Sequence, residues 1–296
     1  MKGLPDFEKS LFELIRRAST DLPADVEGAL RQVLAREKRN SQAAWVLNAI
    51  LENVALARRK DMPICQDTGL PVFSFRVPVG FDVNALAADV RSAVSLATRR
   101  GYLRQNTLDS VTGVPYETNV AHGTPVIQIY HGARKVIDVR ILLKGGGSEN
   151  AGRQYTLPDT GVGAGRDLDA VRRCVLDAIQ KAQGDACPPG VVGVCIGGDR
   201  GTGYEHAKEQ FFRKVDDKSP VRALAKLETK LAREANRLGI GGMGLGGKVT
   251  VLGVKVGALA RVPASFFVSV SFMCWACRRQ GVVLGSQGEI ERWLYR

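Results

Sequence analysis

Apolar residues recur at helical spacing through the first 60 residues of the chain. They lie three or four positions apart, as on the buried stripe of an amphipathic helix. Gly, which weakens a helix interior, occurs in this stretch only at positions 3 and 28. The spacing predicts two or three helices that end before Pro63. The apolar positions are Phe7, Leu11, Leu14 and Ile15, followed by Ala44, Leu47, Ile50, Leu51 and Val54.

Beyond Pro63 the pattern changes to short runs of β-branched and aromatic residues that alternate with helical patterns. Gly and Pro lie at the ends of several runs, and Gly145-Gly146-Gly147 ends one of the expected strands. The expected strands cover 72–77, 125–130, 135–143, 191–196, 249–256 and 266–272. The expected helices cover 83–99, 167–183, a segment from about Tyr204, and 223–237.

The order of these elements favours a mixed α/β (α+β) fold, because helices and strands alternate along most of the chain. The helical N-terminal lobe, residues 1–60, is expected to pack on a layered, sheet-containing region, residues 61–296. No internal repeat or long linker interrupts the sequence. A single domain over 1–296 is therefore the simplest prediction.

Composition is that of an ordinary globular protein, with 45% apolar and 24% charged residues in 296, which excludes disorder as the main state. Lys and Arg exceed Asp and Glu, giving a formal charge of +12. Small acidic substrates or an acidic partner subunit would fit this charge. Nucleic acid is not expected, because aromatics are few and no nucleic-acid motif is visible. Basic clusters such as Arg99-Arg100 and Arg278-Arg279 are scattered, as on a solvated basic surface.

Neither a membrane span nor a signal peptide is expected. The most apolar stretch, 264–277, has 14 residues and contains three serines, whereas a spanning helix needs about 20 apolar residues. Residues 1–9 carry early charges and lack a cleavage site after an apolar run, so the mature chain is expected to begin at or near Met1. Six cysteines without a secretory signal favour a reducing, cytoplasmic location, in which thiols serve as ligands, nucleophiles or core residues.

The spacing of the cysteines alone identifies no compact metal motif. Cys65 and Cys187 each lie beside Pro and Gly in loops next to strands, where backbone amides can reach a thiolate. Cys174, in a helix, and Cys195, in an apolar strand, are interpreted as core residues. The C-x-x-C pair that begins at Cys274 fits either a redox pair or half of a zinc site.

Two glycine-rich segments offer weaker signals. Residues 242–249 approach the phosphate-loop pattern, but Val249 stands where a hydroxyl is needed, so nucleotide binding is not expected. Residues 145–150 could present backbone amides to an anion, or form a plain tight turn.

Four stretches, taken in order, resemble the class I (iron–sulfur) fumarase family, including the α subunits of two-subunit fumarases and of L(+)-tartrate dehydratase. They cover residues 63–69 (PICQDTG), 144–150 (KGGGSEN), 184–200 (GDACPPGVVGVCIGGDR) and 263–279 (PASFFVSVSFMCWACRR). The resemblance extends over most of the chain. Any single stretch could arise by chance, whereas four in the family's order are specific.

The resemblance implies a [4Fe–4S] cluster held by three thiolates, with one iron left open as a Lewis acid. It also implies a small dicarboxylate substrate, with the residue pair after the first ligand on the substrate side. A bidentate arginine fork and backbone amides would grip carboxylate oxygens. The implied ligands are Cys65, Cys187 and Cys274; the implied catalytic residues are Gln66 and Asp67; the implied substrate-binding residues are Gln66, Arg104, Gly145, Gly146 and Gly147.

The expected function is reversible hydration of fumarate to (S)-malate by this chain as an α subunit. The chain ends at Arg296, where single-chain family members continue into a domain with a catalytic base, so a separate β subunit is expected, in a homodimer of α or an α2β2 assembly. Val262 stands where some members carry His. The alternatives are an L(+)-tartrate dehydratase α subunit and a non-catalytic metal-binding paralogue.

Overall fold

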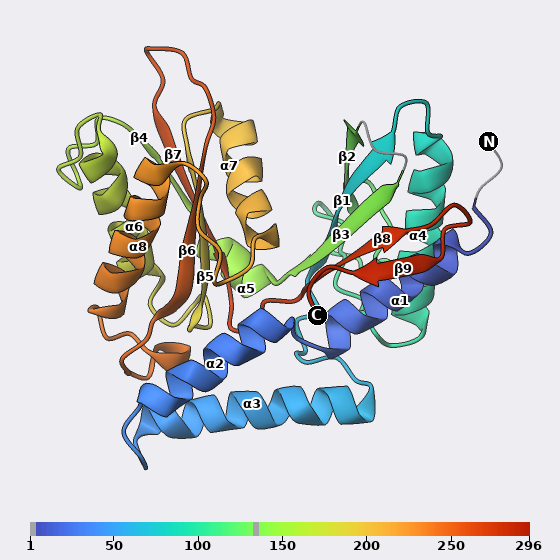
Figure 1. Ribbon diagram of the computed structural model, residues 1–296, viewed down its shortest axis with the longest axis horizontal. Coiled ribbons are helices and arrows are strands. Elements are labelled where there is room, and N and C mark those ends of the chain that lie inside the picture. Colours follow the sequence, from blue (N-terminus) through green and yellow to red (C-terminus); the bar gives the residue numbers. More distant parts are fainter. Residues whose placement is uncertain (1–3, 133–135) are drawn as a thin grey trace. The chain divides into compact units, whose positions relative to one another are not determined.

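The structure is a computed structural model that describes residues 4–132 and 136–296. Contacts between residues divide the chain into two compact units, each made of several segments (Figure 1). Unit 1 contains the chain as far as Ala24, then 52–146 and 278–296. Unit 2 contains 25–51 and 147–277. These units are defined by contacts and do not test which parts of the chain fold independently. The single domain with a helical lobe at 1–60 therefore stays a prediction.

Unit 1 is built on a five-stranded sheet with strand order β2-β1-β3-β8-β9. Strand β1 pairs in parallel with β2 and antiparallel with β3, which is the central strand. Both other neighbouring pairs, β3 with β8 and β8 with β9, are antiparallel. The strands are β1 (Leu70–Pro78), β2 (Val126–Gly132), β3 (Ile137–Lys144), β8 (Arg279–Leu284) and β9 (Ile290–Trp293).

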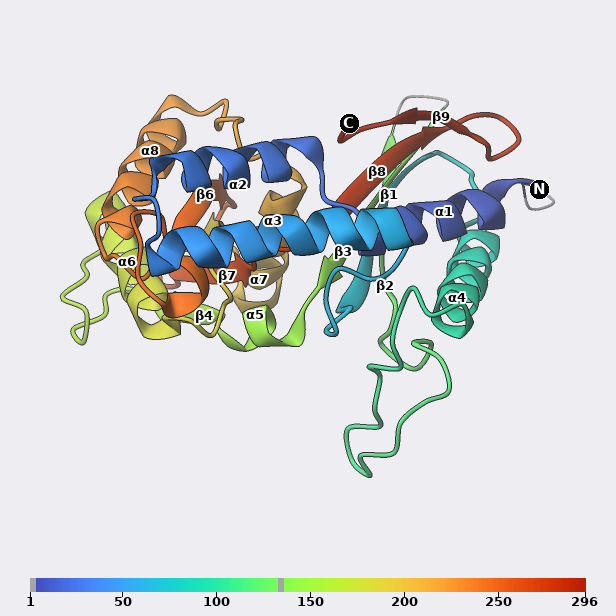
Figure 2. The ribbon, with the colours of Figure 1, turned by 90° about the horizontal axis from the view of Figure 1, so that it is seen from below.

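Helices α1 (Phe7–Thr20) and α4 (Val83–Arg99) pack against each other in unit 1, as Figure 2 shows. Along β1 the side chains of Phe73, Phe75 and Val77 are fully buried, whereas Arg76 is exposed. This alternation has the period of a strand with one face on a core. The first unit therefore buries one face of its sheet under α1 and α4.

Unit 2 is built on a four-stranded sheet with strand order β4-β7-β5-β6. Helices α6 and α8 pack together, α8 on β6 and α6 on β7, while α7 packs on β5 and β7 from the other side (Figure 1). Every residue of β5 is buried, as expected for a strand covered on both faces. The elements are β4 (Arg153–Thr156), β5 (Gly190–Ile196), β6 (Val251–Ala258), β7 (Phe267–Met273), α6 (Leu168–Ala182), α7 (Arg200–Glu209) and α8 (Arg222–Asn236).

The remaining helices include three that lie at the borders of the units. Helix α3 contains the border between residues 51 and 52, and the short helix α5 begins at the border between 146 and 147. A 3-10 turn, η1 (Gln210–Phe212), follows α7, and another, η2 (Gly242–Gly244), lies before β6. The α-helices are α2 (Ala24–Arg36), α3 (Gln42–Lys60) and α5 (Gly146–Asn150).

The mixed α/β class is confirmed, and the expected strands and helices correspond to elements of the structure with shifted ends. The strand expected at 135–143 lies at β3; Lys135 is outside the described residues. Strands β4, β8 and β9 were not anticipated. None of the helices in the described residues is both long and apolar enough to cross a membrane.

Helix α7 begins at Arg200, four residues before the expected start near Tyr204. Asp199 caps it: its carboxylate accepts the backbone N–H groups of Gly201 at 2.7 Å and Thr202 at 3.0 Å. The Thr202 hydroxyl in turn accepts the Asp199 N–H at 3.2 Å, which completes a capping box. The cap provides acceptors for backbone N–H groups in the first turn of the helix. The helix start depends on this cap and not on the apolar pattern, which is why the pattern placed it too late.

Candidate functional site

The six cysteines, all within the described part of the chain, form no disulfide and fall into two groups by burial. Cys65, Cys187 and Cys274 are half-buried. The other three, Cys174, Cys195 and Cys277, are completely buried. Burial raises the pKa of both Cys174 and Cys195 to about 12, so these thiols stay protonated and unreactive at neutral pH. The half-buried group is the set of ligands that the family resemblance implies.

Cys187 and Cys274 lie on two segments that are bonded to each other within unit 2. The backbone N–H of Trp275 donates to the carbonyl oxygen of Cys187 at 3.0 Å. A Cβ on Gly190 would lie only 1.9 Å from the carbonyl oxygen of Met273, so glycine is required for this close approach. Cys187 itself has a φ of +48°, an uncommon conformation for a residue with a side chain. The fold therefore fixes these two cysteine segments side by side.

Cys65 lies in unit 1, on the loop that leads into β1. The backbone of the preceding Ile64 is held on both sides: its N–H donates to Ser19, and its carbonyl accepts the side-chain amide of Asn53 at 2.8 Å. The Cys65 sulfur lies 3.5 Å from the side-chain oxygen of Gln66. The predicted first ligand and the predicted substrate-side glutamine therefore lie next to each other in space as well as in sequence.

Asp67 holds the glycine segment that follows β3. One carboxylate oxygen accepts the N–H of Gly69 at 3.0 Å, and the other accepts the N–H of Gly146 at 2.8 Å. A Cβ on Gly145 would come within 2.9 Å of the same carboxylate. Two of the stretches that carry the resemblance, 63–69 and 144–150, thus meet at this carboxylate.

Gly69 allows the loop to reach the strand end. Its φ is +80°, and an added Cβ would lie 2.8 Å from the carbonyl carbon and oxygen of Lys144. A side chain at this position would be both strained and in collision with the backbone.

Arg104 is anchored to the same loop. Its backbone N–H donates to the hydroxyl of the buried Thr68 at 3.0 Å, and its Nη1 donates to the carbonyl of Gln66 at 3.3 Å. The side-chain amide of Asn106 also donates to the Thr68 hydroxyl, at 3.0 Å. Arg104 is exposed, so its guanidinium faces solvent beside Gln66. Unit 1 therefore brings together Gln66, Asp67, Arg104, Gly145 and Gly146 of the predicted substrate residues; Gly147 begins the next segment of unit 2.

Arg278 and Arg279 are buried, with 1% and 0% of their surface exposed. Their interpretation as part of a solvated basic surface is wrong. Arg278 donates through Nη1 to the carbonyl of Asp67 at 2.6 Å, and its Nη2 lies near Gly145. Arg279 instead lies over the ring of Tyr295, 4.7 Å from its centre. Arg278 is a site residue that sequence reasoning missed, although it lies in the last of the four resembling stretches.

Comparison with known proteins identifies the family from these segments and the sequence around them. Residues 8–283 match the family described as Fumarate hydratase (Fumerase). The chain belongs to the fumarate hydratase family.

Named relatives of this fumarate hydratase family chain fall into two groups. A Geobacillus stearothermophilus protein, provisionally named a class I fumarate hydratase, is 48% identical over 97% of the chain, which spans 57% of that protein's length. The chain is 34% identical to a Methanocaldococcus jannaschii protein provisionally named L(+)-tartrate dehydratase subunit alpha, over 90% of the chain and 93% of that protein. It is 31% identical to the Escherichia coli K12 L(+)-tartrate dehydratase subunit alpha, over 88% of the chain and 85% of that protein.

The thiols of this fumarate hydratase family member fit an iron–sulfur group by their chemistry. Three half-buried cysteines lie on loops, where their thiols are accessible to a metal group, and thiolates are the usual ligands of iron–sulfur clusters. Among the described residues no three His, Cys, Asp or Glu side chains form a ready group around a single metal ion. Cys187 and Cys274 belong to unit 2, and Cys65 belongs to unit 1.

The other motifs of the family member give clear outcomes. Cys277 is fully buried, which does not fit an accessible C-x-x-C redox pair. Lys248, of the phosphate-loop near miss, donates through Nζ to the carbonyl of Arg36 at 2.6 Å, and its N–H donates to Glu37. That lysine is therefore engaged by protein and not directed at a phosphate. Val262 is 63% exposed.

Proposed function

We propose that this chain is the α subunit of a [4Fe–4S]-dependent hydro-lyase that catalyses the reversible hydration of fumarate to (S)-malate. The observation that carries the proposal is the division of the six thiols into three half-buried loop cysteines and three completely buried ones. The first group coincides with the ligands implied by the family. The 48% identity to a protein provisionally named a class I fumarate hydratase supports fumarate as the substrate.

In this proposal Cys65, Cys187 and Cys274 hold the cluster. When bound, the cluster supplies a Lewis-acidic iron for the hydroxyl that is added or removed. The bond between Trp275 and Cys187 keeps two of the three thiol segments in register. Preorganised ligands of this kind lose less conformational entropy when a group binds.

The substrate carboxylate is assigned to Gln66 and Arg104, because Gln66 lies beside Cys65, Arg104 donates to the Gln66 carbonyl, and Arg104 is exposed. A planar arginine fork can donate two parallel hydrogen bonds to a carboxylate. The amides of the segment 145–147 complete the proposed subsite. Asp67 is proposed to act on the substrate through this segment, since its carboxylate already accepts the Gly146 and Gly69 amides.

Dehydration also requires a base to remove a proton from the carbon adjacent to the one that bears the hydroxyl. We assign this base to a separate β subunit. Relatives that the chain covers over 85–93% of their length are named alpha subunits. A homodimer of α or an α2β2 assembly in the cytoplasm is part of the same proposal, with a role in the tricarboxylic acid cycle.

Anaerobic purification tests the cluster. The intact protein should contain about four irons per chain and have a broad brown absorbance. Cys65→Ala, Cys187→Ala and Cys274→Ala should each lose most of the iron, whereas the matched variant Cys195→Ala, in a buried thiol, should retain it. Unchanged iron in all three ligand variants, or one zinc in place of iron, would sink the proposal and favour the non-catalytic metal-binding paralogue, for which Val262 is the motivation.

The substrate is tested with the anaerobic α/β complex supplied separately with malate and L(+)-tartrate. Faster dehydration of malate supports the fumarate proposal. Faster dehydration of tartrate would replace it with the second candidate, which the tartrate dehydratase α relatives favour. If the complex carries its cluster but dehydrates neither malate nor tartrate, the remaining hypothesis is a non-catalytic metal-binding paralogue.

A further inference from the structure

The outer face of helix α8 carries a row of exposed cations. Arg222, Lys226, Lys230 and Arg233 lie on the helix, and Arg237 follows it. At 100° per residue these five positions fall within an arc of about 80°. The residues on the opposite side of the helix, among them Leu224, Leu227 and Leu231, are buried against the sheet. Lys218, exposed in the loop before α8, extends the row to six cations.

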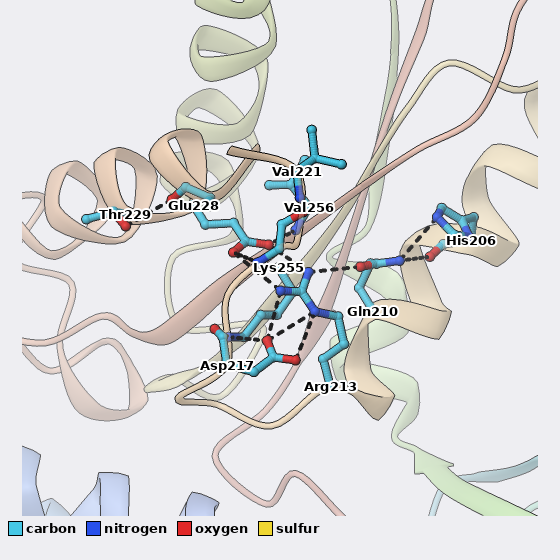
Figure 3. Close-up of polar contacts among 11 residues, drawn as sticks. His206, Gln210, Arg213, Asp217, Val221, Glu228, Thr229, Lys255 and Val256 are labelled. Carbon is cyan, nitrogen blue, oxygen red and sulfur yellow. Dashed lines mark hydrogen bonds and ion pairs between the residues drawn. The ribbon is translucent and has the colours of Figure 1, made fainter. Parts of the chain in front are cut away.

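The acidic residues of α8 lie outside this row and are already paired with arginines. Glu228 is 5% exposed and accepts Nη1 of Arg213 at 2.7 Å and the N–H of Val256 at 2.8 Å (Figure 3). Arg213 also pairs with Asp217, which is bonded to the buried Lys255 (Figure 3). Glu234 pairs with Arg172 at 3.0 Å. Neither carboxylate of α8 is therefore left to neutralise the exposed cations.

The six cations make no ion pair with any acidic residue in the part of the chain that the structure describes. Like charges one turn apart on a helix repel each other by a few tenths of a kcal/mol per pair. The buried network of Glu228, Arg213 and Lys255 holds the helix to β6 and to the loop after α7 despite this repulsion. The charge of this face is therefore not neutralised by acidic side chains of the described residues, which suits a complementary anionic surface.

A shallow groove of about 430 Å³, open to solvent, lies on this face. Ala225 and Thr229, one turn apart, lie along one edge of the row of cations, and the Thr229 hydroxyl donates to the Ala225 carbonyl at 3.0 Å. Small side chains on a helix allow a second helix to approach closely. The residues that line the groove in the described structure include no aromatic ring on which a nucleic-acid base could stack.

We propose that this face docks an acidic amphipathic helix of a protein partner. Lys226 and Lys230 are separated by about 6 Å along the helix axis, and carboxylates at i and i+4 on a neighbouring helix have the same separation. Small residues of the partner would lie over Ala225 and Thr229, and its carboxylates would reach the row of cations beside them. The surface is independent of the cysteines and of the proposed hydration chemistry.

The test measures binding of a labelled synthetic peptide of about 20 residues, with Glu at every fourth position on one face and Ala elsewhere, at about 50 mM salt. The double variant Lys226→Glu/Lys230→Glu is compared with Arg99→Glu/Arg100→Glu, which makes the same change in net charge at an exposed site on α4. The α8 variant should weaken binding at least about tenfold, and the α4 variant by less than about twofold. Circular dichroism checks that both variants are folded.

Three outcomes would overturn the proposal. Equal weakening by the two variants would reduce the surface to non-specific charge attraction. Tighter binding of a single-stranded oligonucleotide or of anionic vesicles than of the peptide, with loss in the α8 variant, would change the class of partner. An unlabelled peptide of the same composition in scrambled order that competes as well as the designed one would show that helical spacing has no role.

Discussion

The guanidinium of Arg278 donates to the backbone carbonyl of Asp67 at 2.6 Å, although the two residues are 211 positions apart. Asp67 in turn accepts the amide of Gly146. A buried arginine, a loop carboxylate and a glycine segment therefore form one connected chain of hydrogen bonds within unit 1.

Replacing Arg278 with Lys should lower kcat/KM on the preferred substrate by about 10- to 100-fold, because small misplacements of substrate-binding groups are costly. Lysine keeps the charge but lacks the planar fork that contacts Asp67 and lies against Gly145 at once. Hydrogen exchange should also become faster at residues 145–147. The matched variant is Arg279→Lys, equally buried but stacked on Tyr295. Equal effects of both variants on exchange at 145–147 would argue against the role of Arg278.

Replacing Gly69 with Ala should destabilise the protein by at least about 3 kcal/mol, since strain from positive φ adds to a collision with the Lys144 carbonyl. Gly80 has a similar φ, +83°, and open space around its Cβ position. Gly80→Ala should therefore cost only about 1 kcal/mol, the conformational part alone. Urea unfolding curves measure both values. If the two costs are the same, the close approach at Gly69 does not constrain the loop.

Alkylation of the metal-free protein at about pH 8 should label Cys65, Cys187 and Cys274 first. Because burial raises the pKa of Cys174 and Cys195 to about 12, about one in ten thousand of these thiols is ionised at that pH. Peptide mass spectrometry over time measures the order, with denatured protein as the control in which all six react. Early labelling of Cys174 or Cys195 would contradict the burial pattern.

The same two thiols predict a loss of stability in alkali. Their folded-state pKa lies above the unfolded value of about 8.5, so unfolding releases protons as pH rises. Their contribution is fully present below about pH 8.5 and is lost progressively between there and about pH 12. Urea midpoints at several pH values from about 8 to 11 should fall less steeply for Cys174→Ala than for the parent protein. Parallel curves would mean that Cys174 ionises in the folded state as it does in the unfolded chain.

Replacing Glu228 with Gln should destabilise unit 2 by about 3 kcal/mol, because Arg213 loses its buried counter-charge. The control is Glu234→Gln on the same helix, whose pair with Arg172 is more exposed; it should cost about 0.5 kcal/mol. Urea unfolding followed by circular dichroism compares the two. A similar small cost for both would mean that water reaches the Glu228 network.

The sequence predicts much of the local structure and the loop positions of Cys65 and Cys187, because periodicity and neighbouring Gly and Pro are local signals, whereas Cys274 joins them only through the family resemblance. The start of α7 was readable too: Asp199 and Thr202 have the spacing of a cap. Cluster binding by the three thiols stays a prediction.

The pairing of strands could not be predicted, because it depends on contacts between distant segments. Phe73 of β1 pairs with Ile127 on one side and Ile141 on the other, and no local pattern specifies either partner. Burial of Arg278 and Arg279 was missed for a related reason, since arginine is almost never fully buried unless paired. The partners that permit burial, Asp67 and Tyr295, are supplied by the tertiary fold.

The position of β8 in its sheet has a consequence for biosynthesis. β8 lies between β3 and β9, yet the ribosome makes all of residues 147–277 after β3 and before β8. During that interval the nascent β3 has an unpaired edge, which can associate with other strands. Unit 2 can fold first, because all of its segments are synthesised before β8. The sheet of unit 1 is completed only after β8, its fourth strand, has been made. The edge of β3 is therefore where we expect a nascent-chain chaperone to be needed.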